Sequence, residues 1–596
     1  MIDRMTKYSF ILLNGEEDAL LDRLQALGLV DITRGEKPVD AESSSLSDEI
    51  DLIQGLIQGI RKIELPEGTQ PVTYPEDDLV RLAGGALMHY TDSKTKVSTL
   101  RAETESLQHW GAFDPTLVQK LSGAGVPLHF HTLAAKQFKP EWKDQYALNV
   151  ISRDKDRMYF VVAGEDGLPG EVPAPARCAS TAEAELQEAL KEQATVLGVV
   201  AAVKERLPEL EAKKRSIYAQ LDKYLAGQAA VPAAEDTIVT LVGYAPTESD
   251  AAVTQALDDA GIFYLQEAAS VEDRPPIRFR NNKFVKMFEV LTDMYGRPEY
   301  DGFDPTPFIA VFFLLFFALC MGDAGYGLVL IVVGMLLKKV DSFKSLAPLV
   351  VTLGGATVIV GFFLHTFFSI DIAQWPCFAG IRGIFLPDEI AGYAGGMVLS
   401  LIVGVVHLCL AMVVKAINAV RVNGFAASLG TLGWTLLIVG GVIVGGISLT
   451  GVMSSEVTKW VVIALGVISA IGIFPLNNPK RNKLANVGLG LWDSYQMVTG
   501  LLGDVLSYLR LYALGLAGSM LGMAFNDMGK MVLGDGSNYI LWIPFILLVL
   551  IGHTLNIAMC ALGAFVHPLR LNFLEFFKNS GYEAGGRKFN PLTNNE

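Results

Sequence analysis

The chain lacks the short motifs that mark the common nucleotide-binding and hydrolytic sites. It contains no GxxxxGK[ST] phosphate loop, no HExxH zinc motif and no GxSxG nucleophile motif. The sequence therefore gives no support for a nucleotide site or for hydrolytic chemistry of its own. We expect a protein that is not an enzyme by itself and that carries no cofactor.

Cysteine and concentrated positive charge are also scarce. The chain has five cysteines, none at CxxC spacing: Cys178, Cys320, Cys377, Cys409 and Cys560. Their scatter indicates neither a disulfide framework nor a zinc site, so we expect no bound metal. The net charge is −15 and no basic patch stands out, which argues against binding to nucleic acid.

The first residues do not form a secretory signal. The stretch MIDRMTKYSFILLNGEED has too short an apolar run, and acidic residues follow it at once. We therefore expect the first half of the chain to stay in the cytosol.

The composition points to a divided molecule. Of the 596 residues, 51% are hydrophobic and the mean hydropathy is +0.36, which does not suit one soluble domain of net charge −15. The charges lie mostly before residue 300 and the long uncharged runs lie after it. We predict a cytosolic domain over residues 1–300 and a transmembrane domain over 301–596.

The second half contains enough apolar length for several membrane spans. A helix needs roughly 20 residues to cross about 30 Å of hydrocarbon. Uncharged runs at or above that length occupy 345–370, 390–414, 422–455, 460–479 and 536–569. Three further candidates are 305–322, the short run 324–337, and one long helix around Arg510 from about 485 to 530.

The positive-inside rule favours eight spans with both termini in the cytoplasm. Eight spans place most loop lysines and arginines inside: Lys338, Lys339, Lys344, Lys415, Arg421, Lys480, Arg481, Lys483, Lys578, Arg587 and Lys588. Only Arg382, Lys459 and Lys530 then face outward. With a single span over 305–337 this bias would invert.

The first half reads as a small α/β lobe in two pieces. Strand, helix, glycine and strand follow one another over residues 6–33, and the same order returns over 236–267. We predict two βαβ halves of one proximal lobe, built from 1–40 and 232–275.

A long insertion separates these halves. Apolar residues recur at three- and four-residue steps over 44–108 and again over 181–226, which is typical of two arms of an antiparallel coiled coil. Strand-like pieces within 116–175 predict a distal lobe between the arms. The fold class is therefore an α+β rod followed by an all-α membrane domain.

Two membrane helices carry polar stripes that end in arginine. Asp493, Gln496, Gly500, Gly503, Ser507 and Arg510 follow at steps of three or four residues, which return to one helix face. His553, Asn556, Cys560, Gly563, His567 and Arg570 repeat the same steps. An arginine at the centre of a span costs at least a few kcal/mol, so Arg510 needs a functional explanation.

Simpler explanations exist for parts of these stripes. Small residues often only let membrane helices pack closely, and Arg570 can extend to the headgroups. His553 and His567 can be structural, and Asp323 can sit in a turn at the membrane surface. Arg510 is harder to explain in this way, because 16 uncharged residues follow it.

Several stretches resemble one known family. They are WGAFDP (110–115), FDPTPF (303–308), MGDAGYG (321–327), SYLRLYALGLAG (507–518) and VHPLRLNFLEFF (566–577). With the N-terminal strand–helix–LGLVDI pattern, they resemble the membrane stator subunit of V-type and A-type rotary ATPases, called subunit a or subunit I. The resemblance runs end to end, and the length is that of the prokaryotic form.

The resemblance implies a mechanism. In that family a ring of proteolipid subunits, each with a carboxylate, rotates against the stator while H⁺ or Na⁺ passes through two separate half-channels. Arg510 matches the essential arginine and Arg570 the second, supporting one. The expected half-channel lining is Asp493, Gln496, Ser507, His553, Asn556, His567 and Glu575, with Asp323 as a further candidate. The chain departs from the eukaryotic pattern at Gly518, where a histidine is expected, and at Cys560, where a glutamate is expected.

The resemblance also implies the surroundings of the chain. Expected partners are the proteolipid ring (c or K subunits), the peripheral-stalk E and G subunits, the central-stalk cap (d or C subunit) and the lipid bilayer. The expected location is the cell (inner) membrane of a prokaryote. An independent secondary ion transporter with a cytosolic regulatory rod is the alternative; it predicts internal repeats with broken helices. A membrane-anchored scaffold without transport would leave Arg510 and both stripes unexplained.

Overall fold

The computed structural model of the chain describes residues 1–33, 40–72, 78–154, 156–164, 167–233, 237–340, 343–449, 451–475, 483–534 and 539–593. The chain divides into two compact units, one of Met1–Phe10 with Val242–Asn590 and the other of Ile11–Leu241 with Pro591–Glu596. We call them unit 1 and unit 2. The loop residues Lys480 and Arg481, predicted to face inside, lie outside the described residues.

The α/β lobe contains the predicted strands and helices. Its elements are β1 (Met5–Leu13), α1 (Glu17–Leu27), β2 (Asp31–Ile32), β7 (Val231–Ala233), β8 (Ile238–Pro246), α8 (Asp250–Asp259) and β9 (Tyr264–Ala268). The sheet has the order β2-β8-β1-β9, with β7 added beside β8. The two βαβ halves therefore interleave, because a strand of the second half lies between the two strands of the first, as in a split βαβ arrangement.

Glycine ends α1 where the sequence predicts. Gly28 has φ +66° and its N–H donates to the carbonyl of Leu24, a left-handed helix end that favours glycine. β1 then pairs antiparallel with β9, with Tyr8 opposite Gln266. Tyr8 and Phe10 are fully buried, which fixes the face that β1 turns inward.

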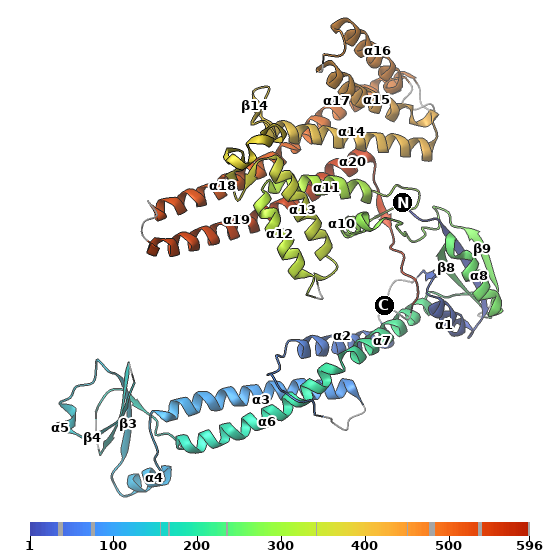
Figure 1. Cartoon of the computed structure of the whole chain (residues 1–596). Coiled ribbons are helices and arrows are strands. Elements are labelled where there is room, and N and C mark those ends of the chain that lie inside the picture. The colour runs from blue at the N-terminus through green and yellow to red at the C-terminus, as the bar shows by residue number, and fades with distance from the viewer. Residues whose placement is uncertain are drawn as a thin grey trace. The chain divides into compact units, whose positions relative to one another are not determined.

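Unit 2 contains two long helix pairs. Its helices are α2 (Ala41–Arg61), α3 (Leu79–Gln108), α6 (Ala179–Glu205) and α7 (Leu207–Gly227). α3 packs along α6 and α2 along α7 (Figure 1). Each predicted arm is thus two helices, with the second arm interrupted at Arg206. The seam between them is apolar: Ile53, Ile60, Val203 and Leu210 are fully buried.

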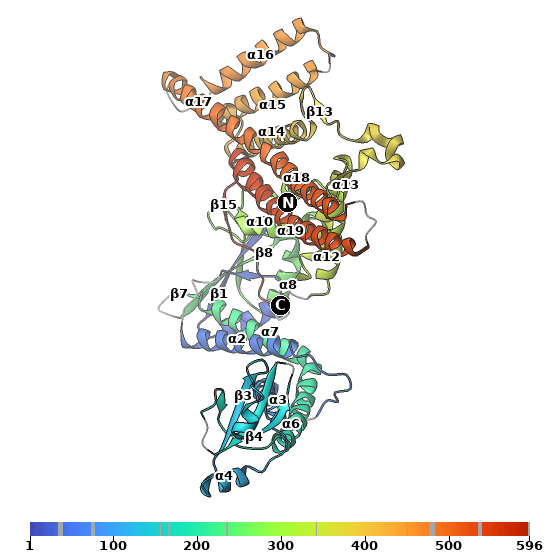
Figure 2. The same cartoon turned by 90° about the vertical axis from the view of Figure 1, so that its left-hand side faces the viewer.

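A four-stranded sheet lies at the end of α3 and α6 (Figures 1 and 2). Its strands are β3 (Leu128–Ala134), β4 (Ala147–Arg153), β5 (Arg157–Ala163) and β6 (Glu171–Val172), in the order β4-β5-β3-β6. Two short helices accompany it, α4 (Pro115–Gly123) and α5 (Trp142–Gln145). Phe160 and Val162 are buried in its core.

The larger part of unit 1 is helical. Its apolar helices are α11 (Thr306–Met321), α12 (Ala324–Leu337), α13 (Ala347–Phe363), α14 (Gly395–Asn423), α15 (Leu429–Leu449), α16 (Ser455–Ile473), α17 (Lys483–Ser507), α18 (Leu509–Leu533) and α19 (Trp542–Arg570). Short elements join them: α9 (Lys283–Lys286), α10 (Glu289–Tyr295), β10 (Arg297–Pro298), β11 (Thr366–Phe367), β12 (Ile370–Asp371), β13 (Glu389–Ile390), β14 (Tyr393–Ala394), α20 (Phe577–Ser580) and β15 (Ala584–Gly586).

Within the described residues, five helices are long and apolar enough to cross a membrane, counting α17 and α18 as one. They span Gly395–Asn423, Ala426–Leu449, Ser455–Ile473, Asn486–Leu533 and Tyr539–Ser580. α11, α12 and α13 are apolar but shorter, at 16, 14 and 17 residues. The predicted span 345–370 ends early, because α13 stops at Phe363 and a hairpin follows.

The predicted long helix around Arg510 is interrupted at Tyr508. There the Tyr508 N–H donates to Val505 and the Leu511 N–H donates to Tyr508, so the helix tightens locally. The fully buried Tyr508 ring packs into the core of unit 1. The interruption falls between Ser507 and Arg510, within the first polar stripe.

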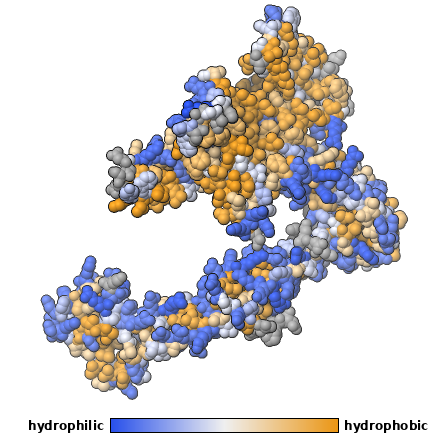
Figure 3. All heavy atoms as spheres, viewed as in Figure 1, coloured by the Kyte–Doolittle hydropathy of each residue, from blue (hydrophilic) through white to orange (hydrophobic). Residues whose placement is uncertain are grey.

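α11 lies at the centre of unit 1. Ile309, Phe313 and Phe316 are fully buried, and α11 packs on α13, α18 and α19. Around it, apolar side chains also cover the outer surface of the helices, which appears orange in Figure 3. That distribution is typical of helices whose outer surroundings are lipid.

Candidate functional site

Arg510 lies in the first turn of α18. The side chain is half-buried, and its Nη1 is buried with no hydrogen-bond partner among the described residues. A buried guanidinium N–H without an acceptor is costly, since arginine stays protonated. Arg510 is thus a fixed positive charge with one N–H group available to an acceptor.

Arg570 is the last residue of α19 and is exposed. A π-helical turn, Leu571–Phe576, follows it directly. Pro568, inside the helix one turn before, has no N–H to donate. π-turns in helices occur frequently at functional sites.

The two arginines meet electrostatically at His567. Both Arg510 and Arg570 act on the imidazole of His567, which is half-buried one turn before Arg570. The arginine ends of the two predicted stripes therefore lie in one region. α18 and α19 run side by side, as Figure 1 shows.

The remaining residues of the first stripe differ in exposure. Asp493 and Ser507 are half-buried, whereas Gln496 is exposed on α17. The Ser507 hydroxyl donates to the carbonyl of Gly503, 3.1 Å away, within its own helix. Their role as channel lining stays a prediction.

The second stripe begins in a buried polar network that joins three helices. His553 Nδ1 lies 2.8 Å from the hydroxyl of Tyr326 on α12, and its Nε2 lies 2.9 Å from Oδ1 of Asn526 on α18. Asn556 donates from Nδ2 to the Tyr326 hydroxyl and to the carbonyl of Gly518, both at 2.8 Å. His553 is 7% exposed and Asn556 is fully buried.

The partners of this network fix its donor and acceptor roles. Asn526 donates from Nδ2 to the carbonyl of Phe368, so its Oδ1 faces the histidine and accepts from Nε2–H. Nδ1 of a neutral imidazole is then the acceptor for the Tyr326 hydroxyl. Both ring nitrogens of His553 are thereby used in holding α12, α18 and α19 together.

Asp323 is a buried helix cap. Its Oδ1 accepts from the N–H groups of Gly325, Tyr326 and Phe368, and its Oδ2 accepts from that of Ser369. The side chain is 2% exposed. Phe368 and Ser369 have φ of +47° and +58°, conformations that this carboxylate holds in place. Asp323 thus joins the start of α12 to the hairpin after α13.

Glu575 lies in the π-turn after Arg570. It is 4% exposed, and its Oε2 is buried without a hydrogen-bond partner among the described residues. It acts electrostatically on Tyr508, whose hydroxyl lies 2.9 Å from Nδ1 of His407. The Tyr508 hydroxyl thus joins the start of α18 to His407 on α14, with Glu575 of the π-turn near enough to act on it electrostatically.

Sequence reasoning missed four of these neighbours: Tyr326, His407, Tyr508 and Asn526. His407 is the only ionisable group in the run 395–414 apart from a cysteine, which is the signal that could have drawn attention to it. Asp504 was also missed; its carboxylate accepts from Nδ2 of Asn579 at 2.8 Å and pairs with Lys578.

Gly518 and Cys560, where the resemblance leads us to expect other side chains, contact one another. A Cβ placed on Gly518 would lie 2.5 Å from Sγ of Cys560. Cys560 Sγ lies 3.4 Å from Oδ1 of Asn556, whose Nδ2 donates to the carbonyl of Gly518. Gly518, Cys560 and Asn556 therefore pack as one group between α18 and α19.

One family model matches the chain in two pieces. The V-type ATPase 116kDa subunit family matches residues 177–345 and 496–594. The second piece includes Arg510, Arg570 and the whole π-turn. The pieces include FDPTPF, MGDAGYG, SYLRLYALGLAG and VHPLRLNFLEFF, whereas WGAFDP and the N-terminal pattern lie outside them.

Relatives extend the similarity over almost the whole chain. The A-type ATP synthase subunit I of Methanocaldococcus jannaschii is 29% identical over 94% of this chain and 82% of that protein. The V-type ATP synthase subunit I 1 of Treponema pallidum is 26% identical over 99% of this chain and all of that protein. The A-type ATP synthase subunit I of Pyrococcus abyssi is 31% identical over 56% of this chain and 50% of that protein.

Proposed function

We propose that this chain is the membrane stator of a V/A-type rotary ATPase, because it is similar to the V-type ATPase 116kDa subunit family and to A-type and V-type ATP synthase subunits I. In this proposal it forms two half-channels for H⁺ or Na⁺ against a rotating proteolipid ring. It binds no nucleotide itself, and the hydrolysis or synthesis of ATP takes place on other subunits.

Arg510 carries the central role in this proposal. Its guanidinium stays charged, so it stabilises the ionised carboxylate of a ring subunit that passes it and favours release of the ion. The same charge repels cations and separates the two half-channels. Arg570 adds positive charge nearby and supports this position.

One observation carries the proposal furthest. Nη1 of Arg510 is buried and unpartnered among the described residues, in a helix otherwise without charge from Leu511 to Asn526. Such a group needs an acceptor that the chain does not provide there. A carboxylate of a neighbouring subunit supplies that acceptor in the geometry that arginine prefers.

The half-channel lining follows the two stripes. We propose that Asp493, Gln496, Ser507, His567 and Glu575 contact water and ions. His553 and Asn556 border the same path, with the Tyr326 contacts holding their side chains in position, and Asp323 supports them from the start of α12. The Gly518–Cys560 contact replaces two ionisable family positions, so the ion does not rely on them.

The membrane topology in this proposal has eight spans. The eight are α11, α12, α13, α14, α15, α16, the α17–α18 pair and α19, with both termini in the cytoplasm of a prokaryotic cell. The uneven distribution of lysine and arginine between the loops supports this orientation.

The first 300 residues act as the anchor. In this proposal a coiled-coil hairpin of residues 44–108 and 181–226 joins the proximal lobe (1–40 with 232–275) to the distal lobe (116–175). Peripheral-stalk E and G subunits and the central-stalk cap (d or C subunit) bind the lobes. The apolar seam between the paired helices supports a rigid connection able to resist torque.

The test is Arg510→Ala in the assembled complex in membrane vesicles. We expect ATP-driven ion pumping to fall at least about 100-fold, the scale seen when one preorganised charge-stabilising group is removed from an active centre. Co-purification with the ring and the stalk subunits should be unchanged. Arg421→Ala, at an exposed arginine of α14, is the matched control and should pump normally.

Arg510→Lys separates charge from geometry. Lysine keeps a positive charge but loses it more readily when buried and cannot bind a carboxylate through two parallel bonds. We expect pumping well below the native rate yet above that of Arg510→Ala. Native pumping by Arg510→Ala would overturn the role of this residue, and purification of the chain free of any ATPase subunit would overturn the proposed function.

A further inference from the structure

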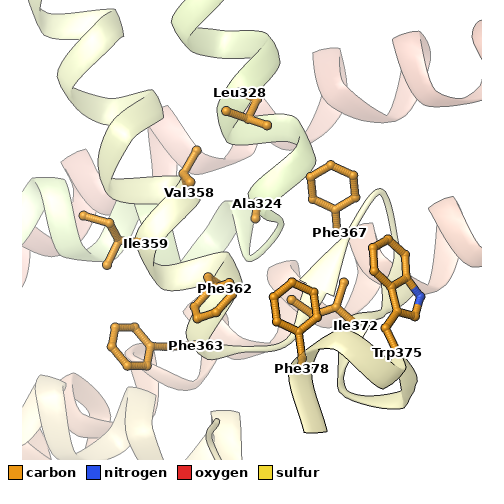
Figure 4. Close-up of a pocket in the computed structure, with 10 residues that line it drawn as sticks. All are labelled: Ala324, Leu328, Val358, Ile359, Phe362, Phe363, Phe367, Ile372, Trp375 and Phe378. Atoms are coloured by element: carbon orange, nitrogen blue, oxygen red, sulfur yellow. The ribbon is translucent and has the colours of Figure 1, made fainter. Parts of the chain in front are cut away.

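An apolar cavity of about 390 Å³ lies between α12, α13 and the loop that follows α13. Ten residues line it, and all are aliphatic or aromatic (Figure 4). α12 contributes Ala324 and Leu328 from its first turns, and the end of α13 contributes residues from Val358 to Phe363. No part of the proposed ion path lines this cavity.

The loop closes one side of the cavity with aromatic rings. Phe367, Trp375 and Phe378 converge on the space that Phe362 and Phe363 border from α13 (Figure 4). Trp375 is 39% exposed. Tryptophan at the edge of an apolar segment is typical of the boundary between the hydrocarbon and the headgroups.

The two helices beside the cavity are short for membrane spans. At 1.5 Å per residue, the 14 residues of α12 extend about 21 Å and the 17 residues of α13 about 26 Å. The hydrocarbon of a bilayer is about 30 Å thick. Each helix is therefore shorter than the hydrocarbon is thick, and the cavity lies at the end of the pair where α12 begins and α13 ends.

A positive charge stands beside the cavity. The Arg382 Nε donates to the carbonyl of Ala373 at 2.8 Å, next to the lining residue Ile372, and Arg382 is exposed. The neighbouring carboxylate of Asp371 accepts from the N–H of Ala373, from Gln374 and from His365. Arg382 is thus held at the cavity by a backbone contact while its Nη groups remain at the surface.

We propose that this cavity binds one acyl chain of a membrane phospholipid, with the phosphate of its headgroup at Arg382. The uniformly apolar lining suits a hydrocarbon chain and offers no partner for a polar ligand. The guanidinium beside it suits a phosphate. The bound chain fills the volume that the short helices leave and holds the 366–378 loop against α12 and α13.

The inference rests on the proposed crossing of the bilayer by α12 and α13. The probe is a phospholipid with a photoreactive diazirine in its acyl chain, added to the complete complex in nanodiscs. After illumination, adducts are mapped by peptide mass spectrometry. We expect adducts on Leu328, Phe363 and Trp375 at least fivefold above those on the outer surface of α12, such as at Val332.

Two matched variants test the cavity itself. Leu328→Phe narrows it, whereas Val332→Phe places the same side chain one turn away at a similar exposure (46% and 51%). We expect the first to reduce cavity adducts at least fivefold and the second to leave them unchanged. Ile359→Phe narrows the cavity from α13 and is the variant to use if Leu328→Phe does not assemble. Arg382→Gln should reduce retention of phospholipid in the purified complex severalfold.

The outcomes separate this inference from the proposed function. Adducts at Val332 without enrichment in the cavity would show a bilayer-crossing helix with no bound chain and would overturn the inference. The absence of adducts from all of α12 and α13 would overturn the proposed spans instead.

Discussion

The helix pairs of unit 2 and those of unit 1 use opposite distributions of polarity. Between α2 and α7 the seam is isoleucine and leucine, with Ile53 and Leu210 fully buried, and the outer surface is polar. α12 and α13 instead meet through glycines: a Cβ on Gly361 would lie 2.2 Å from the backbone of Ala324, and one on Gly354 would lie 2.9 Å from that of Gly327. Figure 3 shows apolar side chains on the outer surface of the unit 1 helices.

The difference reflects the solvent that each region meets. In water, burial of apolar area drives helix pairing. In lipid that force is absent between helices, so small residues allow close packing and buried polar groups hydrogen-bond across helices. Between the helices of unit 1, the hydrogen-bonded side chains of Tyr326, His553 and Asn556 are buried. Between the helices of unit 2, apolar side chains such as Ile53 are buried instead.

The largest expected effect comes from a substitution in the apolar seam of unit 2. Ile53→Ala leaves a cavity in the α2–α7 seam and should destabilise it by about 2–5 kcal/mol. Hydrogen exchange of α2 and α7 amides in the purified complex should accelerate by at least tenfold. The exchange of α12 and α13 should not change; acceleration there would contradict independent packing of the two regions.

Lysine substitutions at two similarly exposed apolar residues, one in each unit, test whether the outer surface of each unit faces lipid or water. Val406 on α14 and Leu52 on α2 are 51% and 55% exposed. Lysine at Val406 should cost about 2.5–3.5 kcal/mol if the side chain faces the bilayer interior, whereas lysine at Leu52 faces water and should cost less than about 0.5 kcal/mol. The yield of membrane-integrated chain measures both, and equal yields would contradict a lipid-facing α14.

The buried polar network gives a smaller effect. Tyr326→Phe removes one hydroxyl and leaves Nδ1 of His553 and an N–H of Asn556 without this partner, at a cost of about 1–3 kcal/mol. The melting temperature of the complex should fall, and the added change His553→Leu should be less than additive. Fully additive effects would show that the two side chains do not interact.

The smallest expected effect concerns the reactivity of a cysteine in each of the two units. Cys178 lies at the start of α6. A hydrogen bond with the Ser180 hydroxyl, and a weaker effect of the Thr181 hydroxyl, lower the pKa of its thiol to about 7. Because a lowered pKa enriches the thiolate, alkylation of Cys178 should be half-maximal near pH 7 rather than near 8.5. Cys320 in α11 is 2% exposed and should not react in the intact complex.

Ser180→Ala provides the control for this titration. Loss of its hydrogen bond should move the midpoint of Cys178 alkylation to higher pH, with Cys320 unchanged. A midpoint that stays near 8.5 in the native chain would contradict the hydrogen bonds at this cysteine.

Local sequence patterns predicted the elements of the α/β lobe better than their arrangement. β1, α1, β8 and α8 form where alternation and helical periodicity indicated. The interleaved order β2-β8-β1-β9 was not predicted, because alternation determines which face of a strand is buried and not which strand lies beside it.

In the candidate site, too, the features local to the chain were predicted and the contacts between elements were not. Periodicity indicated the two stripes because each follows short steps along the chain, although the first crosses from α17 to Arg510 in the first turn of α18. The partners of His553 lie on other elements, with Tyr326 separated from it by 227 residues. The interruption at Tyr508 depends on the packing of its ring with His407 and Phe316, which no local pattern contains.

The contact between Gly518 and Cys560 sets a rule for engineering this protein. A histidine introduced at Gly518 alone would place its Cβ 2.5 Å from Sγ of Cys560, so the cysteine side chain would have to shift. Each position therefore limits the side chain that the other can hold. Gly518 and Cys560 should therefore be substituted together, along with Asn556, whose side-chain amide contacts both residues.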